Sequence, residues 1–356
     1  MKVAGIDYRP IWPGADGESV EIIDQTRLPH AFETRRLASL DDAAEAIRAM
    51  RVRGAPLIGA TAAYGLWLAL RADPSEAALD RAARSLRATR PTAVNLAWAV
   101  GEVRAAVAPR PEAERAAAAF RRAGEICEAD AAMNAALGDH GLTLLRAALA
   151  RKPGGGPLNV LTHCNAGWLA TVDWGTALAP IYRAHAAGLP IHVWVDETRP
   201  RNQGAGLTAW ELGRAGVPCT VIVDNAGGLL MARGEVDLCI TGTDRVAANG
   251  DVCNKIGTYL KALAAADNGV PFYVALPGPT LDWRLPEGGA IPIEARDGRE
   301  VSHVPGVDAA GTWREVQVTP PGAAVANPGF DITPARLVTG FITERGVCAA
   351  SAEGLH

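Results

Sequence analysis

Two short apolar runs end in turns that carry reactive side chains, and this arrangement most constrains the fold. The run 158–162 leads into a His-Cys-Asn turn that contains Cys164, and the run 236–240 leads into a Thr-Gly-Thr turn followed by Asp244. If both runs are neighbouring parallel strands, the thiol and the carboxyl group meet at the carboxyl ends of the strands, where open α/β sheets place their ligand sites. The pattern therefore predicts an acid and a base above one crevice.

Apolar runs recur beyond residue 157 and are separated mostly by segments of helical length. They cover residues 158–162, 191–195, 219–223, 236–240 and 270–276. This alternation is typical of βαβ units and a parallel sheet. Polar side chains follow the strands directly, as in Asp196-Glu197 and Asp224-Asn225. We therefore expect one catalytic edge, with further helices over 208–215 and, capped by Asn254, over 255–266.

The first part of the chain has a different pattern. Residues 1–40 mix short β-like runs with turns, whereas residues 41–150 are rich in Ala and Arg with helical periodicity. Residues 151–157 hold two prolines and no apolar residue to bury, which is typical of a linker. We therefore predict an α/β protein with a small, mostly helical N-terminal domain (1–150) and a Rossmann-like catalytic domain with a doubly wound parallel sheet (151–356).

The C-terminal part is less regular. Residues 277–330 are rich in Pro and Gly, so we expect a long excursion that wraps the sheet. A last helix is predicted over 334–345.

Composition narrows the classes of partner. At 356 residues, with 49% hydrophobic and 21% charged residues, the chain suits a soluble protein of about two domains. A net charge of -4 without a Lys/Arg run argues against nucleic acid as a partner. The longest apolar stretch, residues 60–70, is shorter than the roughly 20 residues that a membrane span needs.

The cysteines and the N-terminus point to a compartment. Six cysteines are scattered without a C-x-x-C pair, so neither a zinc ribbon nor a disulfide framework is indicated. An acid at residue 7 comes too early for a signal peptide. We expect a protein of the reducing cytoplasm.

The segment Arg53-Gly54-Ala55-Pro56 is the clearest candidate anion site. Pro56 suits the first turn of a helix, whose free N–H groups can face a phosphate, and Arg53 adds a bidentate charge. The plain alternative is a helix cap with a solvated arginine.

Other polar segments could either bind a ligand or have only a structural role. Asn254 and Lys255 end a polar turn over 249–255 that could bind a second part of the same ligand, or could simply cap a helix. The loop 199–204, which contains Gln203, and Arg90 before a proline could bind an anion or could be solvated.

The reactive pair also has structural alternatives. Cys164 could be a buried structural thiol, although a helix that begins near Gly167 would lower its pKa. Partial burial would raise the pKa of Asp244 and suit it to general acid catalysis, whereas a salt bridge to Arg245 would keep it ionised.

Several enzyme classes are excluded by missing motifs. The chain has no G-x-G-x-x-G after a strand, no H-E-x-x-H and no G-x-S-x-G, and no metal site is evident. The residues themselves therefore favour acid–base chemistry on a phosphorylated small molecule.

Taken together, several motifs resemble the methylthioribose-1-phosphate isomerase family, which is related to the translation-initiation factor 2B regulatory subunits. The motifs that carry the resemblance occur in order at 53–56, 163–167, 195–204, 244–259 and 327–334. The match spans nearly the whole chain. The resemblance implies conversion of 5-methylthioribose 1-phosphate to 5-methylthioribulose 1-phosphate in methionine salvage, by a cytoplasmic homodimer without a cofactor.

The resemblance also assigns roles to residues. It implies that Asp244 is the proton donor and that Cys164 assists the transition state. It implies that the substrate is bound by Arg53, Gly54, Ala55, Arg90, Gln203, Asn254 and Lys255.

Departures from the family pattern leave the substrate open. Thr243 stands where alanine is expected and Val246 where isoleucine is common, and Trp168 and Trp174 follow Cys164. These changes could reshape the pocket around C5, so 5-deoxyribose 1-phosphate is a possible further substrate. The alternatives are a ribose 1,5-bisphosphate isomerase, which needs a second cationic site, and a non-catalytic regulatory subunit that binds a sugar phosphate or nucleotide.

Overall fold

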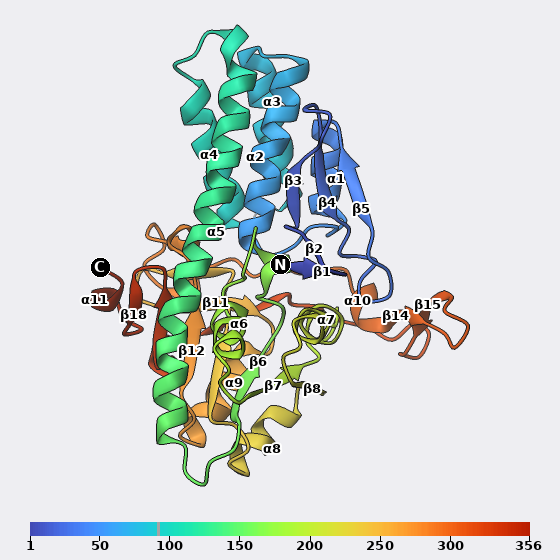
Figure 1. Ribbon diagram of the computed structural model, residues 1–356. Coiled ribbons are helices and arrows are strands. Elements are labelled where there is room, and N and C mark those ends of the chain that lie inside the picture. The colour runs from blue at the N-terminus through green and yellow to red at the C-terminus, as the bar shows by residue number, and fades with distance from the viewer. Residues whose placement is uncertain (91–92) are drawn as a thin grey trace.

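The computed structural model describes residues 1–90 and 93–356 and has a mixed α/β fold built around a large, mostly parallel sheet. Its helices are α1 (Leu40–Arg48), α2 (Ala55–Ala72), α3 (Glu76–Thr89), α4 (Val94–Val107), α5 (Glu112–Arg151), α6 (Leu178–Ala186), α7 (Ala209–Arg214), α8 (Ala226–Ala232), α9 (Thr258–Asp267), α10 (Arg299–Ser302) and α11 (Ala352–Leu355). The helices α1 to α4 gather at one end of the molecule and the large sheet lies at the other, while α5 runs along both (Figure 1).

The strands fall into separate sheets. They are β1 (Lys2–Val3), β2 (Ile6–Asp7), β3 (Ile11–Pro13), β4 (Val20–Ile23), β5 (Thr34–Leu37), β6 (Leu158–Thr162), β7 (Ile191–Asp196), β8 (Cys219–Ile222), β9 (Leu238–Thr241), β10 (Arg245–Ala247), β11 (Val252–Lys255), β12 (Phe272–Ala275), β13 (Leu281–Asp282), β14 (His303–Val307), β15 (Trp313–Gln317), β16 (Phe330–Thr333), β17 (Gly340–Thr343) and β18 (Gly346–Cys348). Within the described residues the largest sheet has the order β18-β17-β12-β9-β6-β7-β8.

The order of the large sheet fixes where a ligand can bind. Starting from β6, the chain adds β7 and β8 on one side, then returns to add β9, β12 and β17 on the other side, all parallel. The direction of winding therefore reverses between β6 and β9. In open α/β sheets the crevice at such a reversal, outside the carboxyl ends of the strands, is the usual ligand site.

The predicted strands are confirmed with small shifts. The runs 158–162, 191–195 and 219–223 correspond to β6, β7 and β8, and the run 236–240 corresponds to β9, which begins two residues later. The predicted helix over 208–215 is α7, which a turn of π-helix over Gly204–Thr208 precedes.

Two predicted helical features are wrong. Residues 334–345 form a short 3-10 turn and then β17, because this segment pairs with β12 inside the sheet. Asn254 does not cap a helix: it lies on β11, which forms an antiparallel pair with β10, and α9 begins only at Thr258, after Gly257 in a left-handed conformation. Tertiary strand pairing thus overrides the local polar pattern of 249–255.

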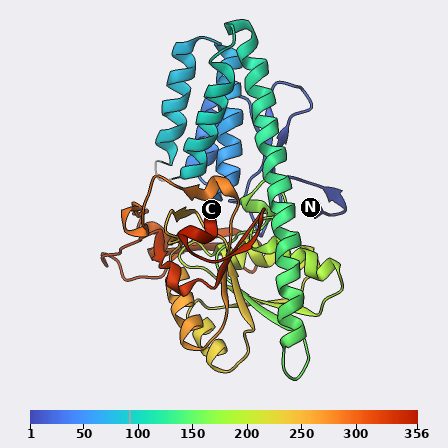
Figure 2. The ribbon, with the colours of Figure 1, turned by 90° about the vertical axis from the view of Figure 1, so that its left-hand side faces the viewer.

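The long helix α5 joins the two ends of the molecule. Its first half supplies Ile126 and Cys127 to the apolar core among α1 to α4, and its second half supplies Leu137 and Leu145 to the core around the sheet. With forty residues it is about 60 Å long. Figure 2 shows it running alongside both groups of elements. The predicted linker at 151–157 follows directly where this helix ends.

The segment 277–330 contributes structure of its own. Its strand β13 pairs with β10 in a second sheet of order β13-β10-β11-β16, and β14 and β15 form a hairpin that projects from the body of the molecule (Figure 1). Within the described residues, no helix is both long and apolar enough to cross a membrane.

Candidate active site

A pocket lies at the point where the winding of the sheet reverses. Its walls come from the turns after β6 and β9, from β11 and from the start of α2. It is lined by Arg53, Gly54, Ala55, Pro56, His163, Cys164, Asn165, Ala166, Ala170, Thr171, Thr176, Gly242, Thr243, Asp244, Asn254, Pro277 and Thr280. The structure therefore brings the predicted thiol and carboxyl group into one pocket, together with the candidate anion-binding segment.

Cys164 is held in a strained turn. It has a φ of 66°, a left-handed conformation that is rare for a residue other than glycine. Its N–H group donates to Thr198 Oγ1 at 2.8 Å, and its carbonyl oxygen accepts from Thr208 Oγ1 at 2.7 Å. These two contacts fix the backbone on both sides of the thiol. Strain of this kind persists only where the surroundings enforce it, and it clusters at functional sites.

The expected lowering of the Cys164 pKa is wrong. The segment after Gly167 forms only a short 3-10 turn, Trp168–Ala170, in place of a helix. Burial instead raises the pKa of the thiol, and the positive charges of Arg53 and Lys255 oppose this effect only in part. The free protein therefore holds Cys164 as a neutral thiol at neutral pH.

Asp244 has the properties predicted for a general acid. Burial raises the pKa of its carboxyl group, against the opposing charges of Lys255, Arg90 and Arg53. Its backbone N–H group donates to the carbonyl oxygen of Cys253 at 3.0 Å, which ties the turn after β9 to β11. A raised pKa lets a carboxyl group keep its proton closer to neutral pH.

The segment 53–56 forms the start of α2, as predicted. Pro56 lies in the first turn, and Gly54 is the N-cap residue with a φ of 87°. A Cβ atom at Gly54 would lie 2.3 Å from the carbonyl oxygen of Ala170, so only glycine allows this close contact. The first turn of α2 faces the pocket, where its free N–H groups can meet an anion.

A buried hydrogen-bond network supports Arg53. The guanidinium donates to the side-chain oxygen and to the backbone carbonyl oxygen of Asn165. The Asn165 amide in turn donates to Glu211 at 2.9 Å and to Thr208 at 3.2 Å. The Glu211 carboxylate also accepts from the Tyr182 hydroxyl and from two backbone N–H groups after Gly167. Arg53 is thus held by a chain of contacts that reaches α7 and α6.

A second pocket lies on the other side of Asp244. It is lined by Ala55, Ile58, Arg90, Ala93, Asp244, Arg245, Cys253, Ile291, Pro292 and Phe330. The lining is mostly apolar. Arg90, a predicted ligand residue, lies here and forms an ion pair with Glu294 at 2.8 Å.

Two further predicted substrate-binding residues, Lys255 and Gln203, do not line the main pocket. Lys255 is buried, and its ammonium lies 5.0 Å from the centre of the Phe330 ring. Burial lowers its pKa, and the nearby Cys164 and Asp244 oppose this effect. Gln203 is also buried, and its side-chain oxygen has no hydrogen-bond partner among the described residues. It lines neither of the two pockets described above. The guanidinium groups of Arg199 and Arg201 instead tether residues 300–301.

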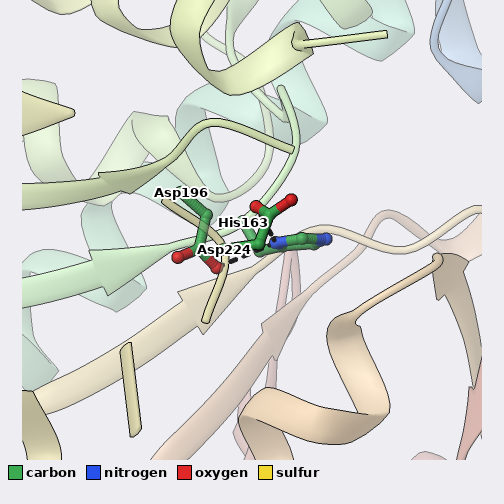
Figure 3. A group of neighbouring side chains, drawn as sticks. All are labelled: His163, Asp196 and Asp224. Carbon is green, nitrogen blue, oxygen red and sulfur yellow. Dashed lines mark hydrogen bonds and ion pairs between the residues drawn. The ribbon is translucent and has the colours of Figure 1, made fainter. Parts of the chain in front are cut away.

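Figure 3 shows a cluster that the sequence analysis did not assemble, and one of its members, His163, lines the main pocket. His163, which directly follows β6, lies beside Asp196, the last residue of β7, and Asp224, which follows β8. Both acids were expected at the catalytic edge because they follow strands. Glu211 gave no such signal, because it lies inside a predicted helix between Trp210 and Leu212 and does not follow a strand.

Comparison with known proteins places the chain in a family. A family model described as the Initiation factor 2 subunit family matches residues 51–350. Relatives named methylthioribose-1-phosphate isomerase from Paramagnetospirillum magneticum and Methylorubrum populi are each 65% identical over all of this chain, which covers 98% and 97% of their own lengths.

Solved structures give the same relationship. The crystal structure of 5-methylthioribose 1-phosphate isomerase from Pyrococcus horikoshii matches with a TM-score of 0.83 and 38% identity, over 98% of this chain and 94% of that one. The structure of translation initiation factor eIF-2B, subunit delta, from A. fulgidus matches with a TM-score of 0.79 and 38% identity, over 96% of both chains.

Proposed function

The chain belongs to the methylthioribose-1-phosphate isomerase family within the initiation factor 2 subunit family, and on this premise we propose that it converts 5-methylthioribose 1-phosphate to 5-methylthioribulose 1-phosphate in methionine salvage. One observation carries the proposal. Cys164 and Asp244 line the same pocket at the reversal of the sheet, beside the anion-binding start of α2. That pocket can therefore hold a sugar phosphate between an acid and a thiol.

The first step needs an acid. A phosphate on C1 locks the anomeric carbon, so the sugar cannot open to a free aldehyde as other aldoses do. The ring oxygen must instead be protonated while the bond between it and C1 breaks. Asp244 has a raised pKa because it is buried, and its neutral form supplies this proton.

The second step moves a hydrogen from C2 to C1, and the hydroxyl group on C2 gives up its proton as it becomes the ketone. The hydrogen from C2 can pass as a proton, with Cys164 as base, or directly as a hydride. Burial holds Cys164 as a neutral thiol, which favours the hydride route because a thiol is a poor base. A pocket that excludes water also protects the cationic intermediate that this route forms.

Positively charged groups near the pocket bind the phosphate. Arg53 and the free N–H groups at the start of α2 bind the phosphate, with Gly54 and Ala55 allowing its close approach. We assign Asn254 and Lys255 to the sugar and phosphate oxygens. We also propose that Arg90 and Gln203 bind the substrate, although neither lines the main pocket in the free protein.

The second pocket supports an apolar group on C5. Its lining of Ile58, Ala93, Ile291, Pro292 and Phe330 suits a methylthio or methyl substituent. Two arginines also line it, and each faces a carboxylate: Arg90 pairs with Glu294 at 2.8 Å, and Arg245 lies 3.7 Å from Asp282. These features argue against ribose 1,5-bisphosphate, whose second phosphate would need unpaired positive charge.

The test is a proton NMR assay in deuterated water with 5-methylthioribose 1-phosphate and 5-deoxyribose 1-phosphate in competition. Conversion of either sugar supports the isomerase, and the ratio of the two rates assigns the C5 group. Deuterium at C1 of the product would favour the proton route. Failure to convert any pentose 1-phosphate would overturn the proposal.

A second candidate function is a binding module, because the chain is also 38% identical to an initiation factor subunit. The pair Cys164 and Asp244 discriminates between the two. An Asp244→Asn variant of an enzyme loses turnover but keeps sugar-phosphate binding, which isothermal calorimetry measures. A binding module has no turnover to lose.

Three further properties belong to the same proposal. We assign residues 1–150 to an N-terminal, mostly helical domain and 151–356 to a Rossmann-like catalytic domain, a division that the strand order of the large sheet supports. We also expect a homodimer in the cytoplasm. Sedimentation equilibrium tests the dimer, and a monomeric mass would refute it.

A further inference from the structure

The buried side chain of His163 faces a hydrogen-bond acceptor at each ring nitrogen. Nδ1 lies 2.8 Å from Asp196 Oδ2, and Nε2 lies 2.8 Å from the backbone carbonyl oxygen of Ile256. A neutral imidazole donates from one nitrogen only, so it would turn a lone pair toward one of these acceptors. Both contacts are hydrogen bonds only if both ring nitrogens carry protons.

The alternative in which Asp196 is the protonated partner does not fit its neighbours. Lys261 Nζ, which can only donate, lies 3.2 Å from the same oxygen, Oδ2, that faces His163. An oxygen that accepts from a lysine ammonium is best ionised. Asp196 is therefore a carboxylate, and its side chain and that of His163 are both fully buried.

Both positive and negative groups from the surrounding elements face His163. Lys261 of α9 also donates to the backbone carbonyl oxygen of Asp224, whose own carboxylate lies 3.9 Å from His163 Nδ1. Asp331 of β16 accepts from the N–H groups of Gly257 and Tyr259. Two cations, His163 and Lys261, are thus surrounded by three carboxylates, so each buried positive charge has a counter-charge and one negative charge remains.

A metal ion is a less suitable occupant of this cluster. The ligand atoms of His163, Asp196 and Asp224 lie within 4.8 Å of one another, a spacing that could hold a cation. However, Lys261 already brings a positive charge to Asp196, and both Asp224 oxygens accept from the backbone N–H groups of residues 198 and 199 at 2.7 Å. The cluster in Figure 3 is therefore an ion-pair network.

The position of His163 links the ion-pair network to the residues of the main pocket. It immediately precedes Cys164, and its partner Ile256 immediately follows Lys255. Its ring also packs on Gly257, where a Cβ atom would lie 2.9 Å from the ring. The contact through Nε2 therefore joins the turn after β6 to the end of β11.

We propose that His163 is a positioning residue: as an imidazolium held between Asp196 and Ile256, it fixes the Cys164 turn against the strand end that carries Asn254 and Lys255. The effect of His163 on turnover rests on the proposed function. The protonation state of His163 is independent of the proposed function, because it follows from the hydrogen-bond geometry alone.

The first test therefore needs no activity. Nitrogen-15 NMR of the intact protein labelled at histidine reports the protons on each ring nitrogen, and the His163→Gln variant assigns the signal. We expect protons on both nitrogens of His163 in the wild-type protein. A single protonated nitrogen would overturn the inference even if the protein were an active isomerase. In Asp196→Asn the ring keeps an acceptor but loses its counter-charge, so we expect it to become neutral.

The second test measures the positioning effect. His163→Asn keeps a donor near the Nδ1 position, toward Asp196, and His163→Gln keeps one near the Nε2 position, toward Ile256. Because a misplacement of about 1 Å can cost about 100-fold in rate, we expect kcat to fall by about 10- to 100-fold in both variants. The melting temperature is measured alongside, since a purely structural role would lower it while leaving kcat per folded molecule unchanged.

The matched control is His192→Gln. His192 lies on β7 and bonds to Thr220, outside the pocket, so this variant should keep wild-type kcat. Wild-type kcat in both His163 variants would overturn the positioning role. If the wild-type protein converts no sugar, the rate of Cys164 alkylation by iodoacetamide replaces kcat, and an unchanged rate in both variants would likewise reject the role.

Discussion

Arg53 and Asn165 are joined by two hydrogen bonds, one from Nη1 to the side-chain oxygen at 2.5 Å and one from Nη2 to the backbone carbonyl oxygen at 2.8 Å. The amide of Asn165 cannot turn around, because its nitrogen donates to Glu211 and Thr208. The orientation of Asn165 therefore fixes the guanidinium that we expect to bind the phosphate. Asn165 thereby positions Arg53 in the pocket that both residues line.

Asn165→Ala should weaken substrate binding. The variant removes the side-chain acceptor and leaves Arg53 with one anchor. Because a hydrogen bond to a charged group contributes about 1.5–3 kcal/mol, kcat/KM should fall by about 10- to 100-fold, mainly through KM. Steady-state kinetics measure this. Tyr182→Phe is the control, because Tyr182 bonds to the far side of the same Glu211 carboxylate. A larger loss in the control would show that folding of the network, not the aim of Arg53, limits activity.

The pH dependence of turnover should report Asp244. Burial raises the pKa of this carboxyl group, and Glu294 adds to the rise, whereas Lys255, Arg90 and Arg53 oppose it. A general acid must be protonated, so kcat/KM should decline as pH rises through the pKa of Asp244. Glu294→Gln removes a negative charge, which lowers this pKa and should move the decline to lower pH.

Lys255→Gln should shift the pKa of Asp244 in the opposite direction to Glu294→Gln. Loss of a positive charge raises the pKa of Asp244, so the decline should move to higher pH even though the overall rate falls. Profiles of kcat/KM against pH for the two variants and the wild type provide the measurement. Shifts in the same direction for both variants would show that another group controls the decline.

The sequence predicted the shared position of Cys164 and Asp244 better than it predicted the elements around them. Cys164 and Asp244 could be placed together because apolar runs before them are parallel strands, and the carboxyl ends of such strands share one edge. The segment 249–255 was misread because Asn254 and Lys255 are polar residues buried in a strand, a pattern that locally looks like a loop and a helix cap.

The helix predicted over residues 334–345 was wrong for a different reason. Its apolar residues Leu337, Val338, Phe341 and Ile342 are spaced as on one face of a helix. In the structure Phe341 and Ile342 are both fully buried on β17, one on each face of the sheet. Pairing with β12 and β18 decides this, and a local pattern carries no information about a partner strand distant in the chain. The contacts of Glu211 and His163 could not be predicted either, because their partners are also distant in the chain.

Stability should depend on pH through Asp130 of α5. Burial raises the pKa of this carboxyl group to about 7, although it accepts a hydrogen bond from the N–H group of Val172 at 2.7 Å. The folded protein thus binds the proton more tightly than the unfolded chain. Its contribution to stability is complete below the ordinary pKa of an aspartate and is lost as pH rises toward 7.

Asp130→Asn should remove this dependence. The amide oxygen can still accept from Val172, but no charge is buried. We expect the variant to gain stability over the wild type as pH rises from 4 to 8, by up to about 4 kcal/mol. Urea unfolding at a series of pH values measures the difference. A difference that stays constant across the series would show that Asp130 does not titrate on folding.

Gly54→Ala should damage the anion-binding start of α2. The residue has a φ of 87°, and the added Cβ atom would lie 2.3 Å from the carbonyl oxygen of Ala170. The backbone must therefore move away from the turn after β6, which carries Arg53 out of reach of Asn165. We expect lower stability together with a loss of sugar-phosphate binding, measured by thermal melting and by calorimetry.

Gly101→Ala is the matched control for this change. Gly101 lies inside α4, and a Cβ atom there would meet no atom within 4 Å. Because alanine has a higher helix propensity than glycine, the control should stabilise the protein by about 0.5–1 kcal/mol and leave binding unchanged. The two variants add the same methyl group, so a difference in ligand binding between them isolates the contact between Gly54 and Ala170. Equal binding in both would mean that the start of α2 does not hold the phosphate.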